Sequence, residues 1–346
     1  MSTALEASPG TPADGVAGPT RRLVREGREG RAGSWTRFVL RRVVGLVTAL
    51  LALLVAVFVM VRLIPGDPVI NALGTDATPE TIARLNAENG FDKPLYEQFL
   101  SYVSNLFQGD LGRSFITNEP VTQIIGQRIG PSLQLAIVAL ALVFLVSIPL
   151  GMVAGGVTQG GRHRRIEVAF TSVTGMFAAI PDYLTATILA FLFAVQIQLF
   201  PVAGADGPQS LVLPVLAVSA GPIMTLARLV RLETLNVLSN DYIRTARSQR
   251  LPRRTIYGRH ALPNVLTAAL TIGGLLFANL IGGAVIVENV FARPGLGSTL
   301  VQAVVAKEYV VVQGVTIVLG AIVIGVIMLV DVALALVDPR SLTRST

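Results

Sequence analysis

Cysteine is absent from the 346 residues, and histidine, lysine and charged residues in general are scarce. Without cysteine the chain has no disulfide framework, zinc–thiolate site, thiol nucleophile or iron–sulfur cluster. Two histidines, at positions 163 and 260, leave little for metal ligation or imidazole base catalysis. Only 14% of the residues are charged, against roughly 25% in a soluble domain, while 52% are hydrophobic. These proportions leave too little polar surface for a water-soluble globule and predict a polytopic membrane protein.

Long hydrophobic runs are what the chain has instead. Crossing a hydrocarbon core of about 30 Å takes about 20 helical residues. No run alternates in polarity with a period of two, so helices are predicted, which satisfy their own backbone hydrogen bonds in lipid. Six runs are long enough, over roughly residues 43–64, 133–157, 168–196, 211–232, 265–287 and 310–337. The first is too long for a signal sequence and has no small-residue cleavage site after it, so we expect it to be retained.

Lysine and arginine give the orientation of these spans. With the N-terminus in the cytoplasm, 21 of the 28 Lys and Arg residues fall on the inner side, in the two termini and two loops. Such an excess of positive charge marks the cytoplasmic side. We therefore predict an all-α integral membrane protein with six transmembrane helices and both termini inside. The net charge of +7 then follows from topology rather than from nucleic-acid binding.

The composition outside the spans divides the chain further. The first segment is rich in Gly, Ala, Pro, Ser, Thr and Arg and cannot bury enough apolar surface to offset its ordering entropy. The predicted divisions are a disordered basic cytoplasmic tail at 1–35, transmembrane helix 1 at 36–64, an extracytoplasmic segment at 65–130, a core with spans two to six at 131–340 that includes a cytoplasmic loop at 233–264, and a cytoplasmic C-terminal tail at 341–346.

Short helices are predicted in two of these segments. Outside, Thr78-Pro79-Glu80 has the pattern of an N-cap followed by proline and an acid, and a second helix is expected between Asp92 and Gly109. Inside, Asn240-Asp241 signals a helix start and Pro252 a stop. A helix of about two to three turns is marginal in water, so either the spans or a second protein must hold it. The alternative is a solvated loop that only enforces topology.

The inner loop resembles a known family. Residues 241–264, DYIRTARSQRLPRRTIYGRHALPN, are similar to the EAA loop of ATP-binding-cassette (ABC) importer permeases. That loop has Glu-Ala-Ala, three residues, Gly, nine residues, Ile, one residue and Leu-Pro. The matching positions here are Arg244-Thr245-Ala246, Arg250, His260 and Leu262-Pro263. The spacing is kept, although Glu, Gly and Ile are replaced. The Arg-Thr-Ala-Arg form resembles the dipeptide/oligopeptide/nickel branch of the family. Within that branch, this chain is similar to the B-type permease.

Further motifs extend the resemblance over most of the chain. They are Pro65-Gly66-Asp67-Pro68, Gly109-Asp110-Leu111-Gly112-Arg113-Ser114-Phe115, Ala179-Ile180-Pro181-Asp182-Tyr183, Phe291-Ala292-Arg293-Pro294-Gly295-Leu296-Gly297, the stretch from Tyr309 to Gly314, Asp331 and Asp338-Pro339-Arg340. Their order on six oriented spans implies the fold of a type I ABC importer permease with an extracytoplasmic segment between helices one and two.

The resemblance implies a transport subunit of a bacterial cell membrane, not an enzyme. It would form half of a path for di- or oligopeptides into the cell, beside a homologous second permease, two ABC ATPases inside and a substrate-binding protein outside. Membrane lipid would be a further partner of this chain. ATP and Mg would bind to the ATPases; no cofactor is expected on this chain, nor a nucleic-acid partner. Nickel, glutathione or haem are alternative cargoes of the same family, and an ion-coupled secondary transporter is a further alternative.

The sequence itself agrees with the absence of catalysis. A phosphate-binding loop needs Gly-Lys, and the only lysines, Lys93 and Lys307, follow Asp92 and Ala306. The chain contains no His-Glu-x-x-His and no Gly-x-Ser-x-Gly pattern, so neither a catalytic nor a metal site is predicted.

Two groups of site residues are predicted. By resemblance, the coupling contact with an ATPase comprises Asp241, Tyr242, Arg244, Thr245, Ala246, Arg247, Arg250, Leu251, Leu262 and Pro263. Candidates for the translocation path are Pro181, Asp182, Tyr183 and Asp331, because intramembrane acids are costly and mark functional sites. Asp182 either lines the path or caps backbone groups freed by Pro181, and Asp331 either pairs with another helix or contacts a subunit.

Overall fold

The computed structural model describes residues 20–63, 69–70, 78–90, 92–161, 163–205 and 207–337. Within these ranges the backbone forms helices joined by turns, with an isolated antiparallel bridge between Arg113 and Pro120. Five helices are long and apolar enough to cross a membrane, and a bent pair of helices supplies the sixth span. The motifs at 65–68 and 338–340 and the tails at 1–19 and 341–346 lie outside the described residues.

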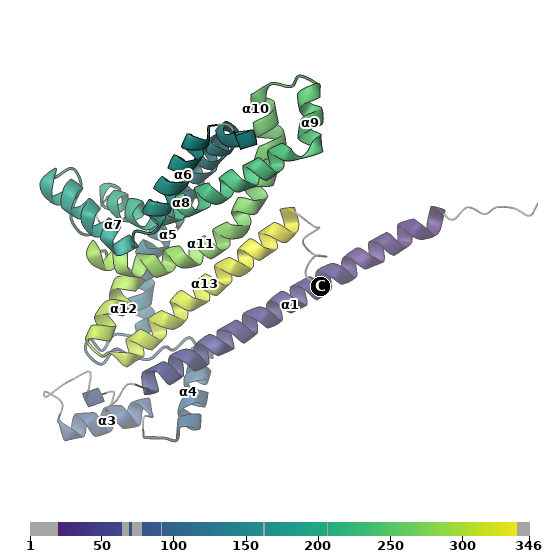
Figure 1. Cartoon of the computed structure of the whole chain (residues 1–346). Helices are drawn as coiled ribbons and strands as arrows, with labels where there is room; N and C mark the ends of the chain where they lie inside the picture. Colours follow the sequence, from purple (N-terminus) through teal and green to yellow (C-terminus); the bar gives the residue numbers. More distant parts are fainter. Residues whose placement is uncertain are drawn as a thin grey trace, which may run out of the picture.

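The first span belongs to helix α1, Thr20–Arg62, whose apolar part is Val39–Met60. The sequence predicts a disordered tail up to residue 35, whereas the described backbone is helical from Thr20 onwards. A helix that the apolar span has already nucleated grows by one hydrogen bond per added residue, and this offsets the weak propensity of the tail. In Figure 1, α1 runs beside α13, Tyr309–Val337, at the edge of the molecule.

The two outer helices begin where the sequence places them. Helix α3 is Pro79–Asn89, and the Thr81 amide donates to the Thr78 hydroxyl over 3.3 Å, so Thr78 is its N-cap. Helix α4 is Leu95–Phe107. Its Phe99 ring packs edge-on against Phe58 of α1, with ring centroids 5.2 Å apart. The extracytoplasmic segment is thus fixed to the outer end of the first span.

The core of the molecule is three long helices packed side by side. They are α5, Val121–Thr158, α8, Gln209–Ser239, and α11, Leu262–Val290. Helices α5 and α8 approach closely because Gly151 of α5 has no side chain: a β-carbon there would lie 2.5 Å from the carbonyl oxygen of Ala227. Small residues allow this contact between membrane helices, where packing rather than the hydrophobic effect holds helices together.

The third span is broken, although the sequence predicts one continuous run over 168–196. Helix α6, Arg164–Ala178, and the helix formed by α7, Asp182–Leu189, and η3, Ala190–Gln196, meet at an angle of 89°. Pro181 stands at the break. It lacks an amide hydrogen and disfavours helical geometry at the preceding residue, so the hydrogen-bond ladder stops there.

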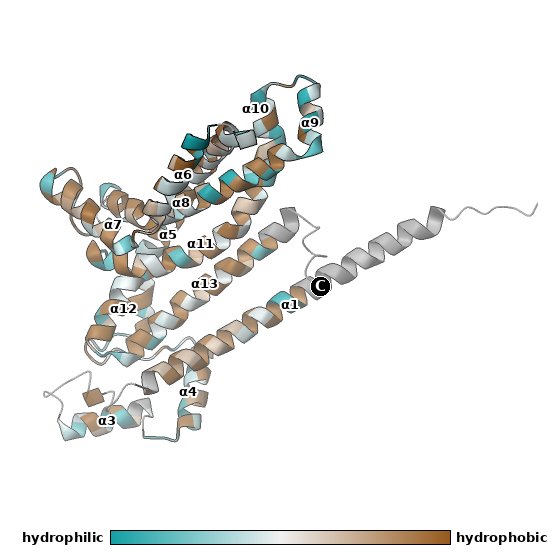
Figure 2. Ribbon diagram, viewed as in Figure 1, coloured by the Kyte–Doolittle hydropathy of each residue, from teal (hydrophilic) through white to brown (hydrophobic). Residues whose placement is uncertain are grey.

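The connections agree with the predicted topology. The inner helix α9, Asp241–Ser248, begins at the predicted position, and α10, Arg253–Thr255, continues through the π-helical stretch η4, Ile256–Ala261, into α11. Helices α9 and α10 lie at one end of the bundle, and α3, α4 and α12, Leu296–Val305, lie at the other (Figure 1). Figure 2 shows polar residues gathered on α9 and α10 and apolar ones along α11 and α13.

Candidate functional site

One face of α9 is anchored in the bundle. The side chains of Ile243 and Ala246 are 0% and 5% exposed, and they belong to an apolar cluster shared with α5, α8 and α11. Leu251 packs against the same cluster from the turn after the helix. A helix this short therefore gains its stability from tertiary packing. Any force on α9 is passed directly to three spans.

The rest of the surface of α9, and the turn after it, carry polar side chains. The residues predicted to contact an ATPase divide into exposed ones, Asp241, Tyr242, Arg244, Thr245, Arg247, Arg250 and Pro263, and buried or half-buried ones, Ala246, Leu251 and Leu262. We name the exposed set Tyr242, Arg244, Thr245, Arg247 and Arg250 the arginine face. Guanidinium groups on it can form bidentate hydrogen bonds with carboxylates, which a lysine ammonium cannot.

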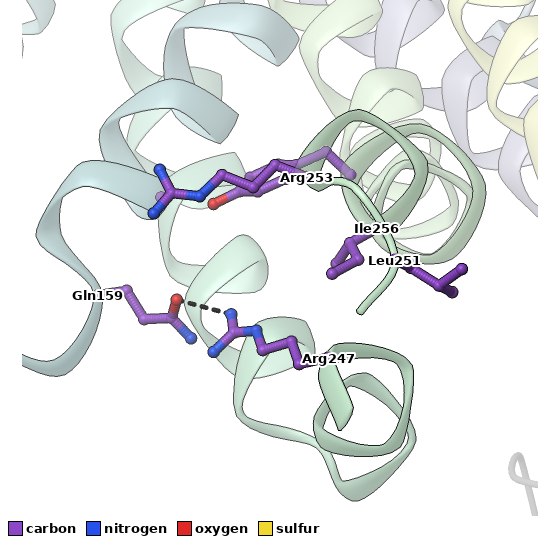
Figure 3. Close-up of a pocket in the computed structure, with 7 residues that line it drawn as sticks. Gln159, Arg247, Leu251, Arg253 and Ile256 are labelled. Carbon is purple, nitrogen blue, oxygen red and sulfur yellow. Dashed lines mark hydrogen bonds between the residues drawn. The ribbon is translucent and has the colours of Figure 1, made fainter. Parts of the chain in front are cut away.

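Arg247 also ties α9 to the neighbouring inner loop. Its Nη2 donates to Oε1 of Gln159 over 2.8 Å, a contact drawn as a dashed line in Figure 3. The two side chains border a hollow of about 290 Å³. Its lining residues are Gly156, Gln159, Arg247, Leu251, Arg253, Ile256 and Tyr257. The inner end of α5 and the loop that contains α9 and α10 thus meet around a cavity with two arginines.

Arg250 occupies the position where the resembling family has glycine. Its φ angle is +56°, in the left-handed region that glycine adopts without a steric penalty. The turn is held by hydrogen bonds from the Arg250 amide to the Arg247 carbonyl and from the Leu251 amide to the Ala246 carbonyl, at 3.0 and 3.3 Å. The backbone therefore keeps the glycine conformation although the side chain has changed.

Arg231 makes a second contact at the inner end, which the sequence did not predict. Arg231 of α8 is 6% exposed; its Nη2 donates to Glu167 of α6 over 2.7 Å and its Nε to Thr158 of α5 over 3.2 Å. The sequence shows these residues only as members of positive inner loops. Their pairing depends on how three helices meet, which no local pattern reveals.

The predicted path residues do not lie together. Asp182 is the first residue of α7, after Pro181 as its N-cap, and Tyr183 is exposed beside it. The Asp182 carboxylate lies against Gly283 of α11, where a β-carbon would collide with it, and near Gly221 of α8. Within the described residues this carboxylate accepts no hydrogen bond, and the N-terminus of α7 has no side-chain cap.

Asp331 lies elsewhere, in an ion pair between helices. Its carboxylate is 2.5 Å from the Arg42 guanidinium, so it joins α13 to α1. This is the interhelix pairing that the sequence leaves open for Asp331. Helix α1 contacts the bundle chiefly through α13, at the edge seen in Figure 1.

A buried carboxylate at the outer end is the main feature that sequence reasoning missed. Glu288, near the end of α11, is 1% exposed. Its Oε1 accepts from the Ser132 hydroxyl over 2.6 Å, and its Oε2 accepts from the amides of Gly297 and Ser298 over 2.8 and 3.2 Å. The predicted span five ends at residue 287, so Glu288 falls one residue outside it and is not among the predicted intramembrane acids. The signal that could have found it is Phe291–Gly297, whose glycines let α12 approach the carboxylate.

Arg293 completes this outer network. It is 1% exposed, and its Nη2 donates to Oε1 of Gln134 on α5 over 2.8 Å. Burial lowers the pKa of the Arg293 guanidinium, and the nearby Glu288 carboxylate opposes that shift by favouring the charged form. Helices α5, α11 and α12 are therefore joined by one buried polar cluster. In the part of the chain that the structure describes, no group of three or more His, Cys, Asp or Glu residues could hold a metal ion.

Known families match this arrangement. Residues 147–343 match the family described as "Binding-protein-dependent transport system inner membrane component", and residues 35–136 match the N-terminal region described for the same kind of component. A chain of the inward facing MetNI methionine ABC transporter has the same fold, with a TM-score of 0.51 at 17% identity, over 64% of this chain and 99% of that chain. The protein is therefore a permease of the type I ABC importer fold.

Curated relatives agree with this class. A Brucella suis biovar 1 protein, provisionally named a peptide transport system permease protein, is 37% identical over 313 residues, which are 88% of this chain and 98% of that protein. A glutathione transport system permease protein of Escherichia coli O6:H1 is 34% identical over 304 residues, 87% of this chain and 97% of that protein. The chain belongs to the family of binding-protein-dependent transport system inner membrane components. It is a multi-pass inner membrane subunit, and ATP hydrolysis lies in partner subunits.

Proposed function

We propose that this chain forms half of the pathway of an importer that moves di- or oligopeptides into the cell, and that α9 couples it to an ABC ATPase. Its partners are a homologous second permease, two ATPases with ATP and Mg, and an extracytoplasmic binding protein. The family, whose description names a binding-protein-dependent system, supports this composition. The observation that carries the coupling is the two-sided construction of α9.

The coupling helix acts as a rigid lever in this proposal. Ile243 and Ala246 fix α9 to the cluster that α5, α8 and α11 share, while Arg244 and Arg250 stay exposed for a partner. When the ATPases close on ATP, a partner that grips the arginine face moves α9, and the attached spans follow as packed bodies. A solvated loop that serves only topology does not need buried apolar side chains on a helix of eight residues.

Peptide cargo is supported by the relatives' names. The Brucella suis protein is named for peptides and the Escherichia coli protein for glutathione, itself a small peptide-like molecule, at similar identity. Nickel chelates and haem remain alternative cargoes of the same family, and an ion-coupled carrier would not use an ATPase surface. Substrate choice is tested by loading the cognate binding protein with labelled dipeptide, pentapeptide or glutathione and measuring uptake into proteoliposomes.

Charge reversal tests the coupling. In the complete importer, reconstituted in proteoliposomes, the double variant R244E/R247E should lose at least tenfold in peptide uptake and in ATPase activity stimulated by binding protein. Carboxylates on α9 would repel the acidic groups that arginines bind. The ATPases should also fail to co-purify in detergent.

Two matched variants separate coupling from other effects. R254E reverses an exposed arginine in the same loop but off α9, and should keep uptake within about twofold because rim charges are screened. Q159A removes the internal partner of Arg247 without changing the arginine face. Undiminished uptake by R244E/R247E, or an equal loss in R254E, would contradict the proposal.

A further inference from the structure

The inner end of α5 borders a second, larger hollow. It has a volume of about 590 Å³ and shares Gly156, Arg253 and Tyr257 with the 290 Å³ hollow beside α9. Its other lining residues are Pro149, Met152, Val153, Val157 and His163. The two hollows are therefore neighbours around one helix–helix contact, where Tyr257 packs so closely on Gly156 that a β-carbon at 156 would collide with its hydroxyl. We name the pair of hollows the α5 groove.

The part of the α5 groove formed by the larger hollow is mainly apolar, and its α5 side chains face outward from the bundle. Val153 is 64% exposed and Val157 is 38% exposed, and both belong to a helix whose apolar window qualifies as a membrane span. Pro149 lies eight residues from Val157 along α5, which is about 12 Å at the helical rise. This length of apolar wall lies at the inner end of the second span, which the sequence predicts over residues 133–157.

The smaller hollow of the α5 groove, beside α9, is basic. Arg253 from α10 and Arg247 from α9 reach the same hollow from two elements, and Figure 3 shows the Arg253 side chain extending across it. His163 stands at the mouth of the larger hollow. No acidic side chain lines either hollow, and within the described residues no ion pair involves Arg247 or Arg253. The groove thus combines an uncompensated positive mouth with an apolar wall.

We propose that the α5 groove binds an anionic phospholipid of the inner leaflet, with the phosphate at Arg253, which lines both hollows, and one acyl chain along Val153 and Val157. The inner leaflet carries anionic headgroups, and basic pockets between spans on the cytoplasmic side suit them. A cytosolic protein could place a carboxylate in the smaller hollow, but it could not reach Val153 and Pro149 inside the span. The apolar wall therefore selects lipid over a cytosolic protein. Bound there, the lipid bridges α5 and α10.

Lipid binding to the purified full-length chain tests this. In a neutral detergent, phosphatidylglycerol should bind and raise the melting temperature, while phosphatidylcholine and inorganic phosphate should have little effect at the same concentrations. R253Q should weaken phosphatidylglycerol binding roughly tenfold, because it removes a charge-assisted hydrogen bond to the phosphate. V153W should weaken it as well, because it fills the apolar wall. R259Q, an exposed arginine nearby that lines neither hollow, is the matched control.

Each other outcome overturns the proposal. If inorganic phosphate protects as well as the lipid and V153W binds normally, the site takes a free anion. If no lipid protects the chain, and R253Q instead loses its ATPase subunits, Arg253 serves a protein. Equal loss in R259Q would mean unspecific attraction to charge. Circular dichroism checks that each variant folds, and if R253Q does not, V153W and the phosphate comparison decide.

Discussion

The outer loops and the inner helix α9 are held in place by different forces. At the outer end, buried carboxylates accept hydrogen bonds from backbone amides: Glu288 binds the start of α12, and Glu308 accepts from the Ser114 hydroxyl and the Ile116 amide over 2.6 and 3.0 Å. At the inner end, α9 is held by apolar side chains, and its arginines stay exposed. The outer loops therefore use their polar groups in internal hydrogen bonds. Helix α9 is anchored mainly by apolar side chains and leaves Arg244 exposed, while Arg247 is bonded to Gln159.

This difference has a physical origin. A buried hydrogen-bonded carboxylate fixes one geometry, because moving it leaves several buried donors unpaired. Apolar packing holds a helix in place without using any of its charges. The outer loops, held in the first way, should resist local deformation, and α9, held in the second way, should move with the spans on which it packs. The variants below test this contrast in order of expected effect.

Loss of the Glu288 carboxylate should have the largest effect on stability. E288A leaves the Ser132 hydroxyl and two amides of α12 without their acceptor, and Arg293 without its nearby negative charge. Three orphaned buried donors and an uncompensated Arg293 predict a loss of roughly 3–5 kcal/mol in the free energy of unfolding. Reversible unfolding in mixed micelles measures it. E288Q retains an acceptor oxygen and should recover part of the loss; a loss below about 1 kcal/mol in E288A would mean that α12 is held by packing alone.

Loss of the Glu308 carboxylate should have a smaller effect. E308A removes the acceptor for Ser114 and Ile116 in the loop that follows α4, at a side chain that is 8% exposed. Two orphaned donors predict a loss of roughly 1–3 kcal/mol. Limited proteolysis between residues 108 and 120 should accelerate in the same variant. Unchanged proteolysis would show that the bridge between Arg113 and Pro120 is enough to order the loop.

The ion pair between Arg42 and Asp331 should contribute less again. Arg42 is 44% exposed at its side chain, so solvent and headgroups screen the pair. A double-mutant cycle with R42A, D331A and the double variant should give a coupling of about 0.5–1 kcal/mol. Uptake should be retained in D331N. Abolished uptake in a folded D331N would instead return Asp331 to the translocation path.

Glycine at position 250 should have the smallest effect, and of opposite sign. R250G relieves a left-handed conformation that costs an L-residue about 1–2 kcal/mol. It also raises the conformational entropy of the unfolded chain, which lowers the free energy of unfolding by about 0.5–1 kcal/mol. We expect a net gain of a few tenths of a kcal/mol, detected as a small rise in melting temperature. R250A keeps the strain and should show no rise. A marked loss of uptake in R250G, with R250A unaffected, would place the function in the backbone angle rather than in the guanidinium.

Hydropathy was enough to predict the spans, because lipid demands about 20 apolar residues. Their orientation, read from the arginines, stays a prediction. Capping rules placed the start of α3, and Asn240-Asp241 placed the start of α9. The 89° bend escaped prediction even though Pro181 was visible, because an apolar run has the same composition whether it is straight or broken. Glu288 escaped because its partners are more than 150 residues away on α5 or beyond a turn, and only folding brings them together.

The π-helical stretch Ile256–Ala261 has a consequence for the other end of the molecule. A π turn contains about one residue more than an α turn, and each residue rotates an α-helix by about 100°. Everything from Leu262 onward is therefore rotated relative to a helix that ran straight from Arg253. Deleting one residue from this stretch would turn the whole fifth span and swing Glu288 away from Ser132. A single residue of chain length beside the cytoplasm thus decides which helix face the outer carboxylate occupies.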